Sequence, residues 1–281
     1  MPYLYCIFRR LRASAAATAT FVVLMFVSMM CLTGCDNRMT TAEVLGIDTL
    51  VWCDSISFGE KGSAVVRLNC LVPTKDSTDM ADNIRKWILM EFENTELDCA
   101  SDIREGLRAQ GRRVLLEDSA DIAETLSYCT DELWPVRFER NMKIDWIYED
   151  DEYLTMHCEF YAYLGGAHGT TYVDFATFRK NDGKLMGWEL LPGWTTQQIT
   201  DSIKRGLVSY FMADDEDDIC EMLMLDLDNA EQLRIFNEDF PLPVTPPYLD
   251  EQGVNVIYQQ YEITPYAAGL PNCVVKRAAK K

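Results

Sequence analysis

The stretch Val136–Leu164, with the sequence VRFERNMKIDWIYEDDEYLTMHCEFYAYL, decides the fold. Apolar and polar residues alternate along its two halves, Val136–Tyr148 and Tyr153–Leu164, a pattern that is typical of strands burying one face. The four acidic residues Glu149–Glu152 separate the halves and would form a charged hairpin tip. We therefore expect an antiparallel hairpin here.

Further strands are predicted on both sides of this hairpin. Between two alternating runs lies Lys180–Gly183, whose Asp-Gly pair is a strong signal for a hairpin turn. The residues Gly59–Gly62 form a similar turn upstream. The predicted strands are Leu50–Phe58, Ala64–Val72, Thr171–Phe178, Lys184–Leu190, Val254–Ile263 and a short one near Cys273–Lys276.

Helices are predicted where apolar residues recur every three or four positions. Asp79 can cap the first of them, and Thr195 or Thr196 can cap a later one. The predicted helices are one from Asp79 to about Phe92, Ser101–Ala109, about Ser119–Leu133, one after the cap at Thr195 or Thr196 with Ile199, Ile203, Leu207 and Phe211 on one face, and one between Asp218 and Phe236. The Pro-rich run Pro241–Pro247 must be extended, because proline restricts itself and the residue before it.

This order of elements predicts an α+β protein with two small modules, each an antiparallel sheet packed with helices. We place the first module at 48–133 and the second at 134–276, followed by a basic tail at 277–281. No repeat of 20 to 50 residues is visible, which argues against solenoids and propellers.

Composition narrows the class of protein. The chain has 281 residues, 45 acidic against 26 basic side chains, a net charge of −19 and 48% hydrophobic residues. This hydrophobic share is high enough to bury a core and excludes disorder. The negative charge argues against nucleic acid as a partner, since phosphates are held by clustered Lys and Arg. Only two histidines are present, so most histidine-based metal or triad chemistry is hard to build. We expect no metal and no cofactor.

The first residues have the pattern of an export signal. Three arginines precede the apolar run Phe21–Leu32, which is short for a membrane-spanning helix. The run ends in Leu32-Thr33-Gly34-Cys35, which resembles the bacterial lipobox. That resemblance implies cleavage after Gly34 and a lipid on the Cys35 thiol, leaving residues 35–47 as a polar tether. A transmembrane anchor and a signal peptide without lipid are the alternatives.

Removal of residues 1–34 would take away three arginines and no acid, so the mature chain would carry a net charge of −22. Such a surface attracts cationic partners at low salt. Seven cysteines follow Cys35, an odd number without any CxxC pair, and their spacing suits neither zinc nor a cluster. We expect most of them to be small buried side chains, and one disulfide of unknown pairing stays open.

Two distant stretches carry a family resemblance. The first is Tyr163–Gly169, YLGGAHG, and the second is Tyr258–Gly269, YQQYEITPYAAG. Together they resemble the DUF3298 family, over about residues 134–276, and residues 48–133 resemble the DUF4163 module that often precedes it. The combination is similar to the sensor region of an anti-sigma factor family that binds lysozyme, and to a non-catalytic part of some peptidoglycan deacetylases. The resemblance implies an extracytoplasmic domain that binds a ligand.

The residues of these two stretches are the candidate ligand-binding site. They are Gly165, Gly166, His168, Tyr261, Glu262 and Tyr266. The glycines allow a positive φ or a close backbone approach, the tyrosines offer a ring and a hydroxyl, and Glu262 is the candidate partner of His168. Purely structural roles, a satisfied turn histidine and tyrosines that pack the last strand, are the alternative.

Other candidate sites are weaker. His157 lies in an alternating strand and is expected to be a wall residue. The acidic run Asp214–Asp218 could hold Ca²⁺, but it lacks the spacing and central glycine of an EF-hand, and acids also favour a helix start. No GxSxG, HExxH or P-loop motif occurs in the sequence.

We therefore expect a lipid-anchored lipoprotein of the cell envelope, outside the cytoplasm, that binds or senses and is not an enzyme. Its expected partners are the membrane, through the lipid on Cys35, and either a cationic protein such as lysozyme or a peptidoglycan fragment. The alternatives are a hydrolase of envelope polymers or an enzyme-accessory domain using His168 and Glu262, and a purely structural lipoprotein.

Overall fold

The computed structural model describes residues 40–75, 78–92, 102–128, 135–223 and 229–278. The chain divides into two compact units, Met1–Thr41 and Ala42–Lys281. The expected signal peptide, Cys35 and the start of the expected tether lie outside the described residues. The end of that tether is folded, because Thr41–Leu45 forms helix α2 and Leu45 is completely buried.

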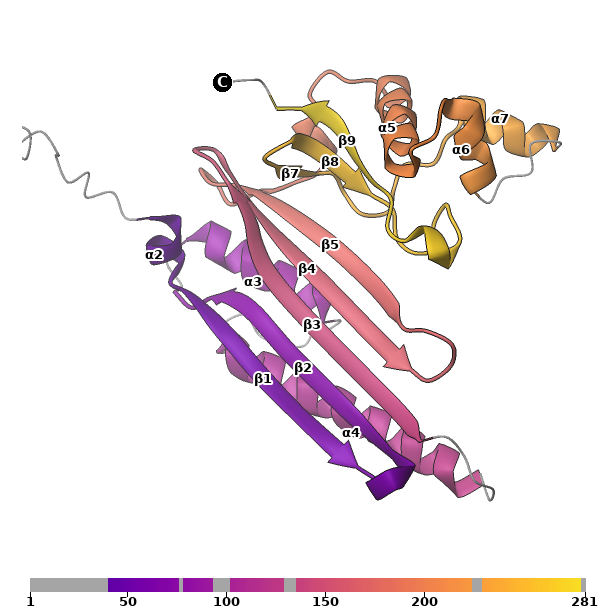
Figure 1. The fold of residues 1–281 in the computed structure, drawn as a ribbon. Coiled ribbons are helices and arrows are strands. Elements are labelled where there is room, and N and C mark those ends of the chain that lie inside the picture. The colour runs from indigo at the N-terminus through magenta and orange to yellow at the C-terminus, as the bar shows by residue number, and fades with distance from the viewer. Residues whose placement is uncertain (1–39, 76–77, 93–101, 129–134, 224–228, 279–281) are drawn as a thin grey trace, which may run out of the picture. The chain divides into compact units, whose positions relative to one another are not determined.

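A six-stranded sheet dominates the second unit (Figure 1). Its strands lie in sequence order, and every neighbouring pair is antiparallel except β2 and β3, which are parallel. A parallel pair needs a long crossover, and here helices α3 and α4 supply it. The six strands are β1 (Ile47–Ser57), β2 (Gly62–Pro73), β3 (Val136–Glu149), β4 (Tyr153–Leu164), β5 (Thr170–Arg179) and β6 (Leu185–Met186).

The sheet confirms the α+β class and most of the predicted strands. The β3–β4 hairpin pairs Phe138 with Leu164 at its open end and turns at the acidic tip, as the alternation predicts. The last predicted strand of this group is shorter than expected, because only Leu185–Met186 pair with β5 and Trp188–Leu190 form a 3₁₀ turn. The β2–β3 pairing also means that the module boundary placed at residue 133 falls between two adjacent strands of one sheet.

Helices α3 (Asp79–Glu91) and α4 (Ile103–Tyr128) cover one face of this sheet (Figure 1). The cap of α3 is Thr78 and not Asp79, since the Thr78 hydroxyl accepts the Ala81 N–H at 3.1 Å. The two predicted helices between residues 101 and 133 are a single helix, α4. Its middle residue Gly111 packs against the ring of Trp52, so the helix is held there by tertiary contact.

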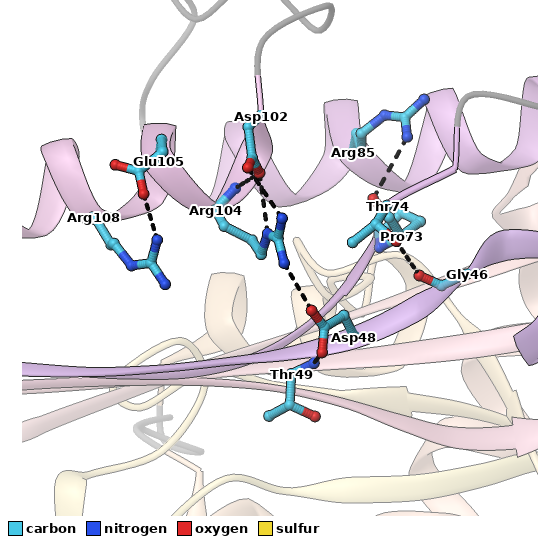
Figure 2. A network of polar contacts seen from close by, with 10 residues as sticks. All are labelled: Gly46, Asp48, Thr49, Pro73, Thr74, Arg85, Asp102, Arg104, Glu105 and Arg108. Atoms are coloured by element: carbon cyan, nitrogen blue, oxygen red, sulfur yellow. Dashed lines mark hydrogen bonds and ion pairs between the residues drawn. The ribbon is translucent and has the colours of Figure 1, made fainter.

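Polar contacts fix the start of α4 to the edge of the sheet (Figure 2). Arg104 donates to Asp102 at 3.1 Å within the helix start and to Asp48 of β1 at 2.8 Å. All three side chains are partly exposed, so the triad positions α4 on β1 and adds little stability. Thr74 closes the same edge by donating its hydroxyl to the Gly46 carbonyl at 2.6 Å.

A second, three-stranded sheet and three helices form a separate hydrophobic core. The capping box of Thr195 and Gln198 starts the helix that was predicted there. The predicted helix between 218 and 236 is instead two shorter helices, and the predicted strand Val254–Ile263 ends at Ile257. These elements are α5 (Thr196–Phe211), α6 (Glu216–Met222), α7 (Ala230–Glu238), β7 (Tyr248–Asp250), β8 (Gly253–Ile257) and β9 (Asn272–Arg277).

The second sheet packs on β5 from the face opposite to α3 and α4. The rings of Phe175 in β5 and Tyr248 in β7 stack with 3.7 Å between centroids, beside Val173 and Ile257. The large sheet thus separates two environments, the helix-covered face and the face that β7 and β8 partly cover. No helix in the described part of the chain is long and apolar enough to cross a membrane.

Candidate functional site

The turn between β4 and β5 carries the first candidate stretch. Gly165 and Gly166 have φ values of +87° and +90°, a conformation that side chains strongly disfavour. Their backbone is fixed by the Tyr163 hydroxyl, which donates to the Gly166 carbonyl at 3.0 Å. The predicted need for glycine at both positions is confirmed by these angles. The turn presents His168 on the surface.

The second candidate stretch reaches this turn through two glutamines that follow β8. The Gln259 amide donates to the Val173 carbonyl at 2.7 Å, and its oxygen accepts the Val173 N–H at 3.1 Å. Gln260 accepts the Thr171 N–H at 2.9 Å. These side chains take the place of a neighbouring strand along the free edge of β5. They therefore hold residues 261–268 beside the β4–β5 turn.

His168, Tyr261 and Tyr266 meet there as an aromatic cluster. The imidazole stacks on Tyr266 with 3.8 Å between ring centroids and 19° between the planes. The Tyr261 ring lies 5.9 Å from that of Tyr266 and is 51% exposed. Tyr261 also has a φ of +66°, which is uncommon for a residue with a side chain and costs about 1 kcal/mol or more.

The hydrogen bonds of His168 define its neutral tautomer. Nδ1 lies 3.0 Å from the Gly169 carbonyl, which can only accept, so Nδ1 carries the proton. Nε2 is then the acceptor that faces the Tyr261 hydroxyl at 3.4 Å. Both ring nitrogens thus have partners within the cluster.

Glu262 is not the hydrogen-bond partner of His168 that the sequence analysis considered. Its two carboxylate oxygens accept backbone N–H groups, from Val244 at 2.8 Å and from Gln259 at 2.7 Å. Among the described residues, no hydrogen bond or ion pair joins Glu262 to His168. The structure brings together the histidine and the tyrosines of the predicted site, and it uses the glutamate to fold the chain around them.

The other singled-out residues lie elsewhere. Tyr258 is completely buried and donates its hydroxyl to the Pro241 carbonyl at 2.7 Å. His157 packs against Phe175, and burial lowers the pKa of its imidazole. In the acidic run, Asp215 accepts the Asp218 N–H at 3.1 Å at the start of α6. The described residues contain no group of three His, Cys, Asp or Glu side chains that could hold a metal ion.

Four described cysteines, Cys70, Cys158, Cys220 and Cys273, are buried, as expected for small core side chains, whereas Cys53 is exposed. Burial raises the pKa of the Cys70 and Cys273 thiols to about 12. Burial raises the pKa of the Cys158 thiol as well, so these three thiols are unreactive packing groups.

The structure contains a buried pair of carboxyl groups that the sequence analysis did not predict. Glu91, the last residue of α3, is hydrogen-bonded to Asp174 in the middle of β5. Burial, and next the charge of Asp174, raise the pKa of Glu91 to about 8, and burial raises that of Asp174 as well. Asp174 occupies an inward position of its strand, and this break in the apolar pattern is the signal by which the sequence could have revealed it.

The sequence was compared with models of known protein families and with curated proteins. Residues 199–278 match the profile of "Protein of unknown function (DUF3298)", so this part of the chain is a DUF3298 domain. The match covers α5 to β9 and the second candidate stretch, and it begins after the β4–β5 turn. No curated protein matches the chain.

Two solved structures share the fold over most of the chain. A crystal structure of a DUF3298 family member from Bacteroides fragilis NCTC 9343 aligns with a TM-score of 0.61 and 18% identity, covering 81% of this chain and 88% of the other. A DUF3298 family protein from Pseudomonas aeruginosa PAO1 aligns with a TM-score of 0.53 and 17% identity, covering 82% of this chain and 90% of the other. At these identities the likeness concerns the fold alone.

Proposed function

We propose that this protein is a lipid-anchored, non-enzymatic binding module of the cell envelope, and that the aromatic cluster of His168, Tyr261 and Tyr266 contacts its partner. The exposed cluster carries the proposal. Tyrosine rings that are held rigidly at a surface supply large contact area at a small entropy cost, which is why tyrosine is enriched in binding sites. The unfavourable backbone conformation of Tyr261 supports a role in function.

The chemistry of the cluster favours binding over catalysis. A general base needs a free lone pair within reach of a substrate proton. Nε2 of His168 faces the Tyr261 hydroxyl instead, and the carboxylate of Glu262 is used by two backbone N–H groups. The net charge of −22 expected for the mature chain suits a cationic protein partner, so lysozyme is the first probe and peptidoglycan fragments are the second.

Calorimetric titration of the purified protein with lysozyme tests the proposal. We expect binding that weakens steeply between low and high salt, and at least tenfold weaker binding for Tyr261→Ala. Tyr128→Ala is the matched control, because Tyr128 is 76% exposed and lies at the far end of α4. Equal losses in the two variants, or no binding of either lysozyme or peptidoglycan fragments, would contradict the proposed role of the cluster.

Two further measurements address the anchor and the alternative. Mass spectrometry of the protein purified from membranes should find a diacylglyceryl group on Cys35, and Cys35→Ala should release the protein into the soluble fraction. Turnover of peptidoglycan fragments that His168→Ala abolishes would instead support the hydrolase alternative and would overturn the non-enzymatic role.

A further inference from the structure

A cavity of about 620 Å³ lies between the helix-covered face of the large sheet and the helices α3 and α4. This volume is typical of pockets for small molecules. Its apolar lining comes from both helices and three strands and from the residue after α3: Val66, Met90, Phe92, Val114, Met142 and Phe160. The cavity is on the opposite side of the sheet from β7 and β8.

The basic side chains at the cavity wall are neutralised by the protein itself. Arg113 forms an ion pair with Glu117 at 2.6 Å, on the same face of α4. Arg140 forms a bidentate pair with the buried Asp118, at 2.8 Å and 2.9 Å. The third arginine of the wall, Arg67, forms an ion pair with Glu139 at 2.6 Å. None of the three is therefore available to an anionic ligand without breaking an existing pair.

The acidic side chains deeper in the wall have no such compensation. Glu91 lines the cavity, and Asp174, which is 8% exposed, lies behind it. Trp87 donates its indole N–H to one oxygen of Asp174 at 2.9 Å. The Phe175 N–H also stabilises the Asp174 carboxylate, but the other oxygen, Oδ1, is buried and, within the described chain, has no hydrogen-bond partner unless the neighbouring carboxyl carries a proton. No Lys or Arg in the described part of the chain forms an ion pair with either acid.

We propose that this cavity is a binding site for a small primary ammonium compound with an apolar chain, whose cationic group is held between the carboxylates of Glu91 and Asp174. The ammonium takes the place of the shared proton and donates to the buried oxygen that lacks a donor, while the chain lies along the apolar wall. Binding then releases one proton from the carboxyl pair, which leaves both carboxylates charged around the cation.

The groups around the pair are neutral or already paired near pH 7. Cys158 lies directly across from Asp174 in β4, Cys70 follows in β2, and Tyr172 is the next inward residue of β5; burial raises the pKa of all three. His157 projects from the opposite face of the sheet, and burial lowers its pKa. With Arg113 and Arg140 held by Glu117 and Asp118, the carboxyl pair is the group that exchanges the proton.

Titration of the full chain with a matched six-carbon series tests this site. The probes are hexylammonium, 1-hexanol and hexanoate, which share the chain and differ in charge. We expect hexylammonium to bind at least tenfold more tightly than hexanol, and hexanoate not to bind. Calorimetry at pH 7 in two buffers of different ionisation enthalpy should report release of close to one proton for each hexylammonium bound, and much less at pH 9.5, where the pair is already ionised.

Variants assign the effect to the carboxyl pair. Glu91→Gln and Asp174→Asn should each weaken hexylammonium binding at least tenfold and abolish proton release. Glu117→Gln removes the partner of Arg113 on the same cavity wall, so it should weaken hexylammonium binding by no more than about threefold and leave the proton release unchanged, because this exposed pair is outside the carboxyl pair. If either pair variant does not fold, the proton release measured with the unaltered protein still tests whether the carboxyl pair binds the cation.

Three results would overturn the proposal. They are equal affinity for hexylammonium and hexanol, binding without proton release at pH 7, and absence of binding for the whole series. A loss in Glu117→Gln as large as in Glu91→Gln would also overturn it, because the cation would then be held by general acidity of the wall.

Discussion

The imidazole of His168 lies flat on the ring of Tyr266, with 3.8 Å between centroids, although 98 positions separate them in the chain. The contact joins the β4–β5 turn to the segment that follows β8. It depends on Gln259 and Gln260, whose amides bind the edge of β5 and thereby bring the segment into place. The stack is therefore the end point of a larger structural connection, and each part of that connection can be tested.

Removal of the Tyr266 ring should loosen the aromatic cluster. We expect Tyr266→Ala to lower the free energy of unfolding by about 2 kcal/mol. The variant loses the aromatic stack with His168 and the apolar area that the half-buried ring covers. Urea denaturation measures this change. Tyr266→Phe keeps the ring and should stay within about 0.5 kcal/mol of the unaltered protein. Equal losses for the two variants would mean that the hydroxyl, not the stack, holds the segment.

Gln259 should be the more important of the two glutamines for stability. Gln259→Leu keeps the shape but leaves the buried N–H and carbonyl of Val173 without partners, at an expected cost of about 2–4 kcal/mol. Gln260→Leu exposes only the Thr171 N–H, which water can reach, and should cost about 1 kcal/mol or less. Denaturation of both variants in urea gives the comparison, and a larger loss at Gln260 would contradict the edge-strand role of Gln259.

The local elements of this fold were predictable, because alternation and turn residues act over a few positions. The β3–β4 hairpin and the Thr195 cap follow from such signals. The parallel pairing of β2 with β3 does not, since it depends on how α3 and α4 pack as a crossover. The predicted strand beyond Ile257 failed for a similar reason: the side chains of Gln259 and Gln260, not their backbone, pair with β5.

The candidate site likewise has a part that the sequence predicts and a part that it does not. The glycines of the β4–β5 turn and the tyrosines near residue 261 stand out in the sequence, and the structure does bring His168 to Tyr261 and Tyr266. Proximity along the chain predicts Glu262 as the partner of His168, but the carboxylate of Glu262 accepts two backbone N–H groups instead. The pair of Glu91 and Asp174 spans two elements whose contact no short-range pattern specifies.

Gly111 in the middle of α4 should be needed for its lack of a side chain. A Cβ at this position would lie 2.5 Å from the Trp52 ring, so Gly111→Ala must push the indole or the helix aside. We expect a net loss of about 1 kcal/mol, because overpacking costs about 1–3 kcal/mol and the better helix propensity of alanine returns about 1.

The background variant Trp52→Leu provides the control for this substitution. Without the indole, the same Gly111→Ala change should become stabilising by up to about 1 kcal/mol. Thermal or urea unfolding of the four proteins in this cycle measures the coupling between the two residues. A destabilising effect of the same size in both backgrounds would show that Gly111 is required for a reason other than the contact with Trp52.

Stability should fall as the pH rises from 7 to 9, because the folded protein keeps a proton on the carboxyl pair that the unfolded chain has lost. The pKa of Glu91 is raised to about 8 in the folded protein from a usual value of about 4.5, so the native state binds more protons than the unfolded state across this interval. The contribution of Glu91 to stability is fully present below the pKa that it has in the unfolded chain. It is lost as the pH rises through the pKa that it has in the folded protein. The expected loss from Glu91 between pH 7 and pH 8 is about 1 kcal/mol.

The interval from pH 7 to 8 isolates this effect, because the buried thiols, whose pKa values are also raised, add a loss of the same sign only as the pH approaches the usual thiol value of 9.0. His157, whose pKa is lowered by burial, acts with the opposite sign, but only below its unfolded value near 6.5. The exposed Asp182 and Glu189, whose pKa values are lowered to about 2 by Arg179 and Lys184, act only in acid. Urea midpoints at pH 7, 7.5 and 8 should therefore decline for the unaltered protein and stay nearly level for Glu91→Gln. A decline of equal size in Glu91→Gln would assign the pH dependence to groups outside the carboxyl pair.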